Sequence, residues 1–401
     1  MTNPARPNPR PFHERIFPLG IPLAWRQLVA EKKRFAAAVA GIMFAVTMML
    51  FQMGLNSALF DEVVAPLLQM QGDLVLISPQ FEYFGISREF PKTRLLQADG
   101  LAEVQDDASL NLGSLPFKNP ETGRERSIFI MAFNPEEHPF KNPQILTQQD
   151  KLKEDDVLLF DTLSRSDYGE IGPLLAANQG DVETEVEGRR MLIGGTFTMG
   201  PTFAADGNVL MSRKAFLQVW PNGREDEISV GLLTLKPGSD VEAAAQKLRT
   251  ALPEDVDVYT MNQFIEKEKT YWRDRTPIGF VIGASMAVAM IVGAVIVYQI
   301  LYTDVTDHLP EYATLKSIGF TDGYFIRLVL QESVILSVLG FIPGTALAAV
   351  LYWLTRMMAH MPTRLYTDNV LEVFGLSVGM CLIAGALATR KLRQANPADI
   401  F

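Results

Sequence analysis

The sequence predicts an α-helical membrane bundle of four transmembrane helices, with a large α+β domain inserted between the first and the second helix. Three observations support this fold class. Four apolar runs are each long enough to cross a hydrocarbon core of about 30 Å, which takes about 20 helical residues. A long polar segment separates the first run from the second, whereas the later connections are short. Within that segment, short β-rich runs alternate with helical patterns, which is typical of an α+β domain.

The same runs predict the boundaries along the chain. In order, we expect an N-terminal tail with an amphipathic helix (1–34), transmembrane helix 1 (35–56), the α+β domain with stalk helices at both ends (57–276), transmembrane helix 2 (278–302), a connecting loop and short helix (303–323), transmembrane helix 3 (324–354), a short loop (355–369), transmembrane helix 4 (370–389) and a C-terminal tail (390–401). Trp25 among basic residues suits an amphipathic helix at the membrane surface, and equally a plain basic flank with an aromatic anchor.

Charge predicts the orientation. Basic residues predominate just before the first apolar run and just after the last, and such residues stay on the cytoplasmic side. Both ends of the chain are therefore expected inside, as an even number of spans requires, and the α+β domain outside. The overall net charge is −10, and the outer segment is the acidic part. This excess of acid argues against nucleic acid as a partner, because phosphate binding needs clustered Lys and Arg.

The sequence offers no active site. It contains no G-x-x-x-x-G-K-[ST] phosphate loop, and no pair of His or Cys residues has the spacing of metal ligands. The one cysteine, Cys381, lies in the fourth apolar run, so the outer domain cannot form disulfides. Acidic clusters such as Glu154-Asp155-Asp156 are interpreted as solvated surface. We therefore expect a protein that is not an enzyme and holds no metal or other cofactor.

Glycines four residues apart occur in three of the apolar runs. Small residues at this spacing let helices approach closely, which is how membrane helices pack without a hydrophobic driving force. The pattern predicts a tight bundle and a homodimer, although small residues are also simply common in such helices. Pro343 is expected to bend the third span. The pairs are Gly279 and Gly283, Gly340 and Gly344, and Gly375 and Gly379.

Two features flank the start of the third span. Leu309–Ser317 can form a short helix at the cytoplasmic surface, with Gly319 as its C-cap. Glu332 lies near the inner end of the span, beside Arg327 and Gln331, where a carboxylate is costly unless it is paired. A structural role, as a partner of Arg327 or of a neighbouring helix, stands beside a role in handling a substrate.

The segment 298–344 resembles the FtsX-like permease domain of the MacB-type ABC exporter superfamily, and in particular the DevC-like permeases. In that family, a surface helix with a charged-x-x-x-Leu-Lys/Arg-x-x-Gly pattern precedes a span that begins with a Leu/Gln-Glu-Ser/Ala element. The basic pair that precedes Ile-Gly in MacB-like proteins is absent. The matching positions are Glu311, Leu315, Lys316, Ser317, Ile318, Gly319, Gln331, Glu332 and Ser333, with a closing Asn396-Pro397-Ala398-Asp399.

The resemblance implies a mechanotransmission permease of the bacterial inner membrane with a periplasmic α+β domain. ATP and Mg²⁺ would bind a separate ABC ATPase, a periplasmic adaptor (membrane fusion protein) and a TolC-like outer-membrane channel would complete an efflux pump, and the cargo would be lipid-like or amphipathic. An FtsX-like regulator of cell-wall hydrolases and a Lol-type lipoprotein-releasing permease are the alternatives. The residues expected to couple to the ATPase are Leu309, Glu311, Leu315, Lys316, Ile318 and Gly319.

Overall fold

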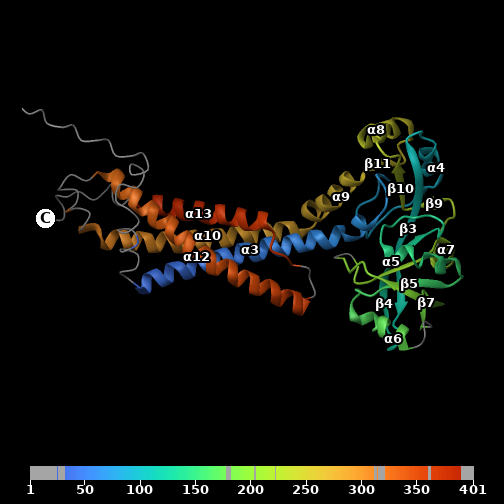
Figure 1. Cartoon of the computed structure of the whole chain (residues 1–401), viewed down its shortest axis with the longest axis horizontal. Coiled ribbons are helices and arrows are strands. Elements are labelled where there is room, and N and C mark those ends of the chain that lie inside the picture. Colours follow the sequence, from blue (N-terminus) through green and yellow to red (C-terminus); the bar gives the residue numbers. More distant parts are fainter. Residues whose placement is uncertain are drawn as a thin grey trace, which may run out of the picture. The chain divides into compact units, whose positions relative to one another are not determined.

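A computed structural model describes residues 32–177, 182–202, 205–221, 223–310, 321–359 and 363–389, together with Trp25 and Thr314. The chain divides into two compact units, one of Met1–Ala58 with Val281–Phe401 and the other of Leu59–Phe280 (Figure 1). Within the part of the chain that the structure describes, four helices are long and apolar enough to cross a membrane. The predicted fold class, a bundle of four such helices and a large α+β domain, is therefore confirmed.

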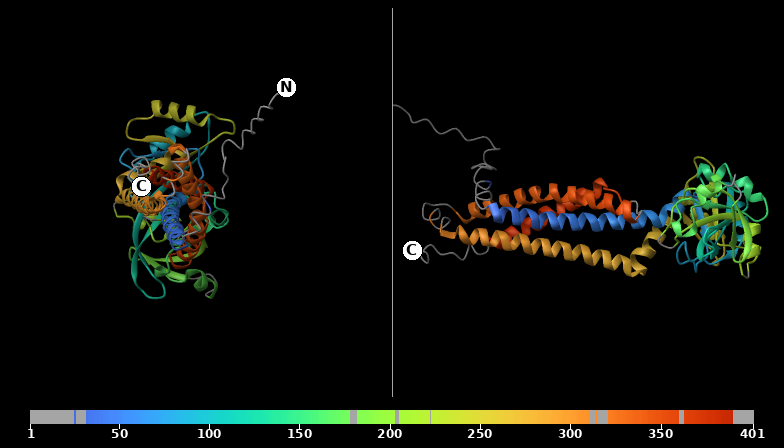
Figure 2. Two further views of the ribbon diagram at one scale, coloured as in Figure 1. Left: turned by 90° about the vertical axis from the view of Figure 1, so that its left-hand side faces the viewer. Right: turned by 90° about the horizontal axis from the view of Figure 1, so that it is seen from below.

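The first unit is the helical bundle. Its helices are α3 (Lys32–Gln69, whose last turns belong to the second unit), α10 (Pro277–Asp307), α12 (Asp322–Ala359) and α13 (Thr367–Ala388). Figure 2 shows them side by side from two further directions. Helix α3 has the largest buried share in its most apolar window, 44%, against 17% for α10. It is thus the central helix of the described bundle.

Close packing around α3 depends on residues without a side chain. A Cβ atom on Gly340 would lie 2.5 Å from the Cβ of Ile42, and one on Gly344 would lie 2.9 Å from the Cβ of Val46. Gly293 on α10 approaches Ala45 in the same way. Because real Cβ atoms are not found so close to other atoms, α10 and α12 can come this close to α3 at these positions only because the residues are glycines.

Polar groups also tie α12 and α13 to α3. The hydroxyl of Thr47 donates to the carbonyl oxygens of Met43, at 2.7 Å, and of Gly344, at 3.0 Å. The hydroxyl of Tyr352 donates to the carbonyl oxygen of Leu50. Near the end of this unit, the Asn369 amide donates to Ser57 at 3.1 Å. Such bonds leave fewer polar groups unsatisfied in an apolar environment.

The second unit is built on a nine-stranded sheet in the order β11-β1-β10-β3-β4-β8-β5-β7-β6. The second half of this order runs from β3 to β6. Strand β6 also pairs with β3, so these six strands form a closed ring. The strands are β1 (Leu74–Ile77), β3 (Val104–Lys118), β4 (Glu125–Phe133), β5 (Val157–Asp161), β6 (Val182–Val186), β7 (Arg189–Phe197), β8 (Asn208–Ser212), β10 (Val230–Leu235) and β11 (Asp257–Thr260), beside a small sheet of β2 (Phe90–Pro91) and β9 (Glu227–Ile228).

The two halves of this unit share one strand. Residues Val104–Leu110 of β3 pair with β10, and Asn111–Lys118 pair with β4. The open half, β11-β1-β10-β3, is covered on one face by α4 (Thr93–Asp99) and α8 (Val241–Ala251). Its other face packs against α9 (Met261–Thr270) and the last turns of α3.

Strand β1 shows why both faces must be covered. Leu74 and Leu76 pack with α4 and α8, whereas Val75 and Ile77 pack with Phe264 of α9. Successive side chains of a strand point to opposite faces, so an uninterrupted apolar run indicates a strand buried on both. The ring has its own core, around Phe117, Phe160 and Phe216. Its short helices are α5 (Pro143–Leu146), α6 (Ile171–Ala177) and α7 (Arg213–Val219), with the 3₁₀ turns η1 (Gln149–Lys153) and η2 (Ser166–Tyr168).

We expect Gly340→Ala to destabilise the bundle, because the added methyl group would overlap Ile42. Overpacking of this kind typically costs about 1–3 kcal/mol. The matched control is Gly375→Ala on α13, where no described heavy atom lies within 4 Å of the added Cβ. Thermal unfolding of the purified protein in detergent should show a lower Tm for the first variant only. Equal Tm values for the two variants would contradict the close contact of α3 with α12.

Candidate functional site

A capping box and a backbone hydrogen bond fix the base of helix α9. Thr260 caps the helix: its side-chain oxygen accepts from the Gln263 backbone N–H at 3.3 Å, and the Gln263 side chain accepts from the Thr260 N–H at 3.2 Å. This reciprocal arrangement, a capping box, satisfies two backbone donors at the helix start. Met261 N–H donates to the carbonyl oxygen of Asp73, just before β1. The start of α9 is therefore held to the sheet.

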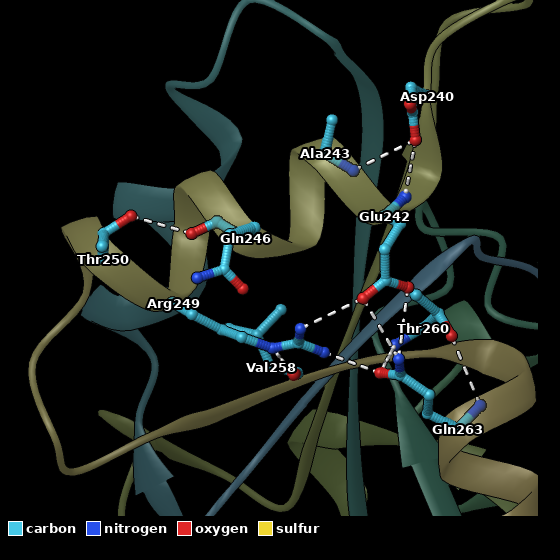
Figure 3. Close-up of polar contacts among 9 residues, drawn as sticks. All are labelled: Asp240, Glu242, Ala243, Gln246, Arg249, Thr250, Val258, Thr260 and Gln263. Carbon is cyan, nitrogen blue, oxygen red and sulfur yellow. Dashed lines mark hydrogen bonds and ion pairs between the residues drawn. The ribbon is translucent and has the colours of Figure 1, made fainter.

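A polar network joins this capping box to helix α8 (Figure 3). The Gln263 amide donates to both carboxylate oxygens of Glu242, at 3.3 and 3.2 Å. The Arg249 guanidinium donates to the Gln263 side-chain oxygen at 2.6 Å, to Glu242 at 3.3 Å and to the carbonyl oxygen of Val258 at 2.9 Å. One arginine thus connects α8, β11 and the first turn of α9, and these elements can move only together.

The other end of α9 carries a buried carboxyl group, that of Glu268, which is only 2% exposed. Its Oε2 accepts from the backbone N–H of Phe84 at 2.9 Å, and its Oε1 accepts from the indole N–H of Trp272 at 3.1 Å. Phe84 belongs to the loop that joins β1 to β2, and Trp272 to the π-helical turn η3 (Tyr271–Arg275) that precedes α10. Glu268 therefore bridges a loop and a helical irregularity, and π-helical turns occur frequently at functional sites.

Burial raises the pKa of Glu268 to about 7, although its two hydrogen bonds and Lys267 act in the opposite direction. The folded protein thus holds the neutral carboxyl group better than water does. That contribution to stability is fully present below pH 4.5, the ordinary value, and is lost as the pH rises through about 7. A shift of this size corresponds to about 3 kcal/mol.

A small cavity adjoins the Glu268 carboxyl group. Its volume is about 10 Å³, which is room for about one water molecule. Apart from Glu268 and Thr202, its lining is apolar or glycine. The loop residue Tyr83 stacks on Tyr271, with ring centroids 4.7 Å apart, and meets Trp272 edge-on at 5.3 Å. The carboxyl group is therefore enclosed by aromatic side chains from both of the segments that it bridges.

Most of the predicted coupling residues lie outside the described part of the chain: Glu311, Leu315, Lys316, Ile318 and Gly319. Leu309 is described, and it packs against an apolar cluster that includes Val305, Phe325 and Val329. Thr314 is helical, and its hydroxyl donates to the Pro310 carbonyl oxygen at 2.9 Å. The function of this segment is still a prediction.

Arg34 at the start of α3 forms an ion pair with Asp307 at the end of α10. The connecting loop has few basic residues by sequence, and this contact gives one of its carboxylates a partner within the bundle. Both side chains are about two-fifths exposed, and exposed ion pairs contribute little to stability. The ion pair shows that the start of α3 lies beside the end of α10, but it contributes little to the stability of this contact.

The intramembrane polar residues occupy different environments on α12. Glu332 is fully buried, Gln331 is half-buried and Arg327 is exposed. Positions five apart on a helix point in different directions, and the difference in burial agrees with that. Next to Glu332, the Ser333 hydroxyl donates to the Val329 carbonyl oxygen at 2.8 Å.

The three glycine pairs also differ in their surroundings. Gly340 and Gly344 face α3, as described above. A Cβ atom on Gly279 would instead overlap the carbonyl oxygen of Arg273. The turn before α10 therefore has no room for a side chain at position 279. At Gly283, Gly375 and Gly379 such an atom would have no described neighbour within 4 Å.

Sequence reasoning missed Glu268, although the pattern contains a signal for it. Phe264, Glu268 and Trp272 are spaced four apart, so they share one face of a helix. The neighbouring charged residues of α9, such as Glu266, fall on other faces. An acid between two large aromatic residues on one helical face predicts a buried carboxyl group. Among the described residues, no three His, Cys, Asp or Glu side chains are placed to hold a metal ion.

Comparison with known proteins matches residues 283–397 to the family model "FtsX-like permease C-terminal". Among curated proteins, the chain is 24% identical over 190 residues to the uncharacterized ABC transporter permease MJ1507 of Methanocaldococcus jannaschii, covering 44% of this chain and 46% of that protein. It is 26% identical over 119 residues to the uncharacterized ABC transporter permease YknZ of Bacillus subtilis, covering 30% of each. The chain thus spans less than half the length of these relatives.

Solved structures with some likeness are extramembrane domains. The periplasmic region of MacB from Actinobacillus actinomycetemcomitans aligns with a TM-score of 0.35 at 9% identity, over 49% of this chain and 92% of that one. The extracellular domain of the transporter YknZ from Gram-positive bacteria aligns with a TM-score of 0.32 at 10% identity, over 47% and 99%.

We expect Thr260→Ala to loosen the base of α9. Loss of an N-cap costs about 1 kcal/mol, so the amides of the first turn of α9 should exchange with solvent about fivefold faster. Hydrogen exchange of the full-length protein measures this directly. Thr250→Ala is the control, because its hydroxyl bonds only to carbonyl oxygens of its own helix. If Thr260→Ala leaves exchange in α9 unchanged, the cap does not hold the helix.

Proposed function

We propose that this chain, whose residues 283–397 match the model of the FtsX-like permease C-terminal family, is the permease subunit of an ABC exporter. In this proposal it transmits the motion of a separate ATPase to its extramembrane domain. The observation that carries the proposal is the family match itself, which covers most of α10 and all of α12 and α13. The two curated relatives, which carry the name ABC transporter permease, support it.

ATP hydrolysis is assigned to a partner. The 401 residues contain no phosphate loop, and such a loop is what holds nucleotide and Mg²⁺ in ATPases of this kind. The chain itself is proposed to be neither an ATPase nor another enzyme. Its contribution would be mechanical, in that it offers a surface to the ATPase and helices that pass the movement on.

The helices are suited to that task. Helix α3 is continuous from Lys32 to Gln69, and a helix of 38 residues is longer than a membrane crossing requires. Helix α9 is fixed at its start by the capping box and by Arg249. A displacement can be passed on only by an element whose end does not slip, and the polar network around Gln263 supplies such an end.

The remaining parts of the proposal come from the DevC-like resemblance of residues 298–344. Two copies would pair in the bacterial inner membrane, with the acidic domain in the periplasm. A periplasmic adaptor and, through it, a TolC-like outer-membrane channel would complete the pump. The cargo would be lipid-like or otherwise amphipathic.

Co-purification from native membranes tests this assembly. An ABC ATPase together with an adaptor protein is the result expected for an exporter. An ATPase together with a cell-wall hydrolase or its activator would instead indicate an FtsX-like regulator, and a lipoprotein carrier would indicate a Lol-type permease. Recovery of this chain without any ATPase would contradict the proposed function.

We expect Leu315→Asp to prevent recruitment of the ATPase, because Leu315 is the proposed apolar contact of the coupling helix. The measurement is the amount of ATPase that co-purifies with the full-length protein. Thr321→Asp is the matched control: it adds the same charge at an exposed position next to α12, where Asp is a favourable N-cap. Normal ATPase binding by Leu315→Asp would show that the coupling residues are wrongly assigned.

The proposed orientation predicts which positions an impermeant thiol reagent reaches. With the outer membrane permeabilised, Thr122→Cys in the exposed loop after β3 should react, and Ser317→Cys should react only after the inner membrane is opened. The native Cys381 is buried, so it contributes little background. Labelling of position 317 in cells with an intact inner membrane would reverse the orientation.

A further inference from the structure

We propose that the loop between β1 and β2 is a latch on helix α9, and that proton binding to Glu268 controls whether this latch is closed. This device is independent of the proposed export function, because all of its parts lie within the second unit. It consists of the Glu268 carboxyl group, the loop around Phe84, the π-helical turn η3 and the small cavity among them.

One hydrogen bond and several aromatic contacts hold the loop to α9 and η3, and the hydrogen bond is made to the Glu268 carboxyl group. One oxygen of Glu268 accepts from the loop at Phe84, and the other accepts from η3 at Trp272. Tyr83, next to Phe84, stacks on Tyr271 and meets Trp272 edge-on. Phe81 packs on Phe264 at 5.5 Å. A change in the charge of Glu268 therefore affects its hydrogen bond to the loop and its hydrogen bond to η3 at the same time.

The surroundings do not compensate a negative charge on Glu268. On α9 itself the nearby cation is Lys267. The loop presents Tyr83 and Glu82, and η3 presents Tyr271 and Arg275. The cavity lining from α3, from β4 and from the bridged pair Thr202 and Ala205 has no ionisable side chain: it consists of Val63, Pro66, Phe129, Thr202 and Ala205. Acids and phenols thus face the carboxyl group about as much as cations do.

Ionisation consequently favours opening. An ionised carboxylate gains most from water, and the closed cavity has room for only about one molecule. Lifting the loop away from α9 would hydrate the group and return its pKa toward the ordinary range. By linkage, the closed state binds the proton more tightly than the open state, so closure is favoured as the pH falls and opening as it rises.

Opening would also uncover the turn η3, because Tyr83 would leave its ring contacts with Tyr271 and Trp272. This turn is the last segment before Pro277 and α10. Opening or closing of the latch therefore changes the contacts of η3, the segment that connects this domain to α10. Through the latch, the pH of the surrounding compartment can act on this segment.

Hydrogen exchange of the full-length protein at several pH values tests the latch. The quantity to follow is the protection factor of peptides from 79–89, corrected for the intrinsic pH dependence of exchange, with strand β4 as internal reference. From pH 5 to pH 8 we expect the protection of the loop to fall by roughly 50-fold, with its midpoint near the pKa of Glu268. Protection of β4 should not change.

Three variants separate the latch from a general effect of pH. Glu268→Gln cannot ionise, so the protection of the loop should no longer depend on pH. The amide nitrogen of Gln cannot accept a hydrogen bond from Phe84 or Trp272, so one of the two bonds is lost and the protection should be lower than in the wild-type protein at pH 5. Glu266→Gln removes an exposed acid of the same helix and should keep the wild-type transition. Trp272→Phe removes a donor that favours the ionised form, so the midpoint should move to higher pH.

The proposal is overturned by any of three results. These are a loop in the wild-type protein whose protection does not change between pH 5 and pH 8, a wild-type transition that persists in Glu268→Gln, and a midpoint in Trp272→Phe that moves to lower pH.

Discussion

The extramembrane domain depends on the double pairing of strand β3. One backbone of 15 residues supplies hydrogen bonds to β10 in its first half and to β4 in its second half. The open sheet under α9 and the closed ring beside it therefore cannot shift independently, since a one-residue slip would turn the side chains of both to the wrong face. The fixed base of α9 and the loop that covers Glu268 are both built on this common support.

Two buried carboxylates show how this domain places charge. Asp161 at the end of β5 is fully buried and accepts from the backbone N–H groups of Leu163, Met199 and Gly200 and from the amide of Asn208. Glu268 accepts from Phe84 and Trp272, and burial raises its pKa more than these two hydrogen bonds lower it. A carboxylate that accepts many hydrogen bonds serves as a fixed support for a loop, whereas one that accepts few is sensitive to its protonation state.

The four spans and the α+β class followed from the sequence because apolar length and period 2 alternation are local properties of a chain. Strand β3 could not be predicted from the sequence, because Gln105–Asp107 and Pro116 interrupt its apolar pattern. Its buried polar residues find partners far along the chain: Ser109 donates to Glu137, and Asn111 to the carbonyl oxygen of Glu227. Glu268 likewise appears as one acid among several in α9 until Phe84 is brought to it. The sequence does not show which distant residue will be the hydrogen-bond partner of a polar side chain, and without such a partner the side chain would not be buried.

The contact of Tyr352 with α3 has a consequence for how positions 54 and 352 can vary in evolution. The ring lies so close to Gly54 that a Cβ atom there would overlap its phenol group, while the hydroxyl donates to the Leu50 carbonyl oxygen. Neither position can change alone: a larger residue at 54 needs a smaller one at 352, and a smaller residue at 352 leaves a void beside Gly54. Natural variants should therefore exchange these two residues as a pair, so that covariation between them would report the approach of α12 to α3 in relatives of unknown structure.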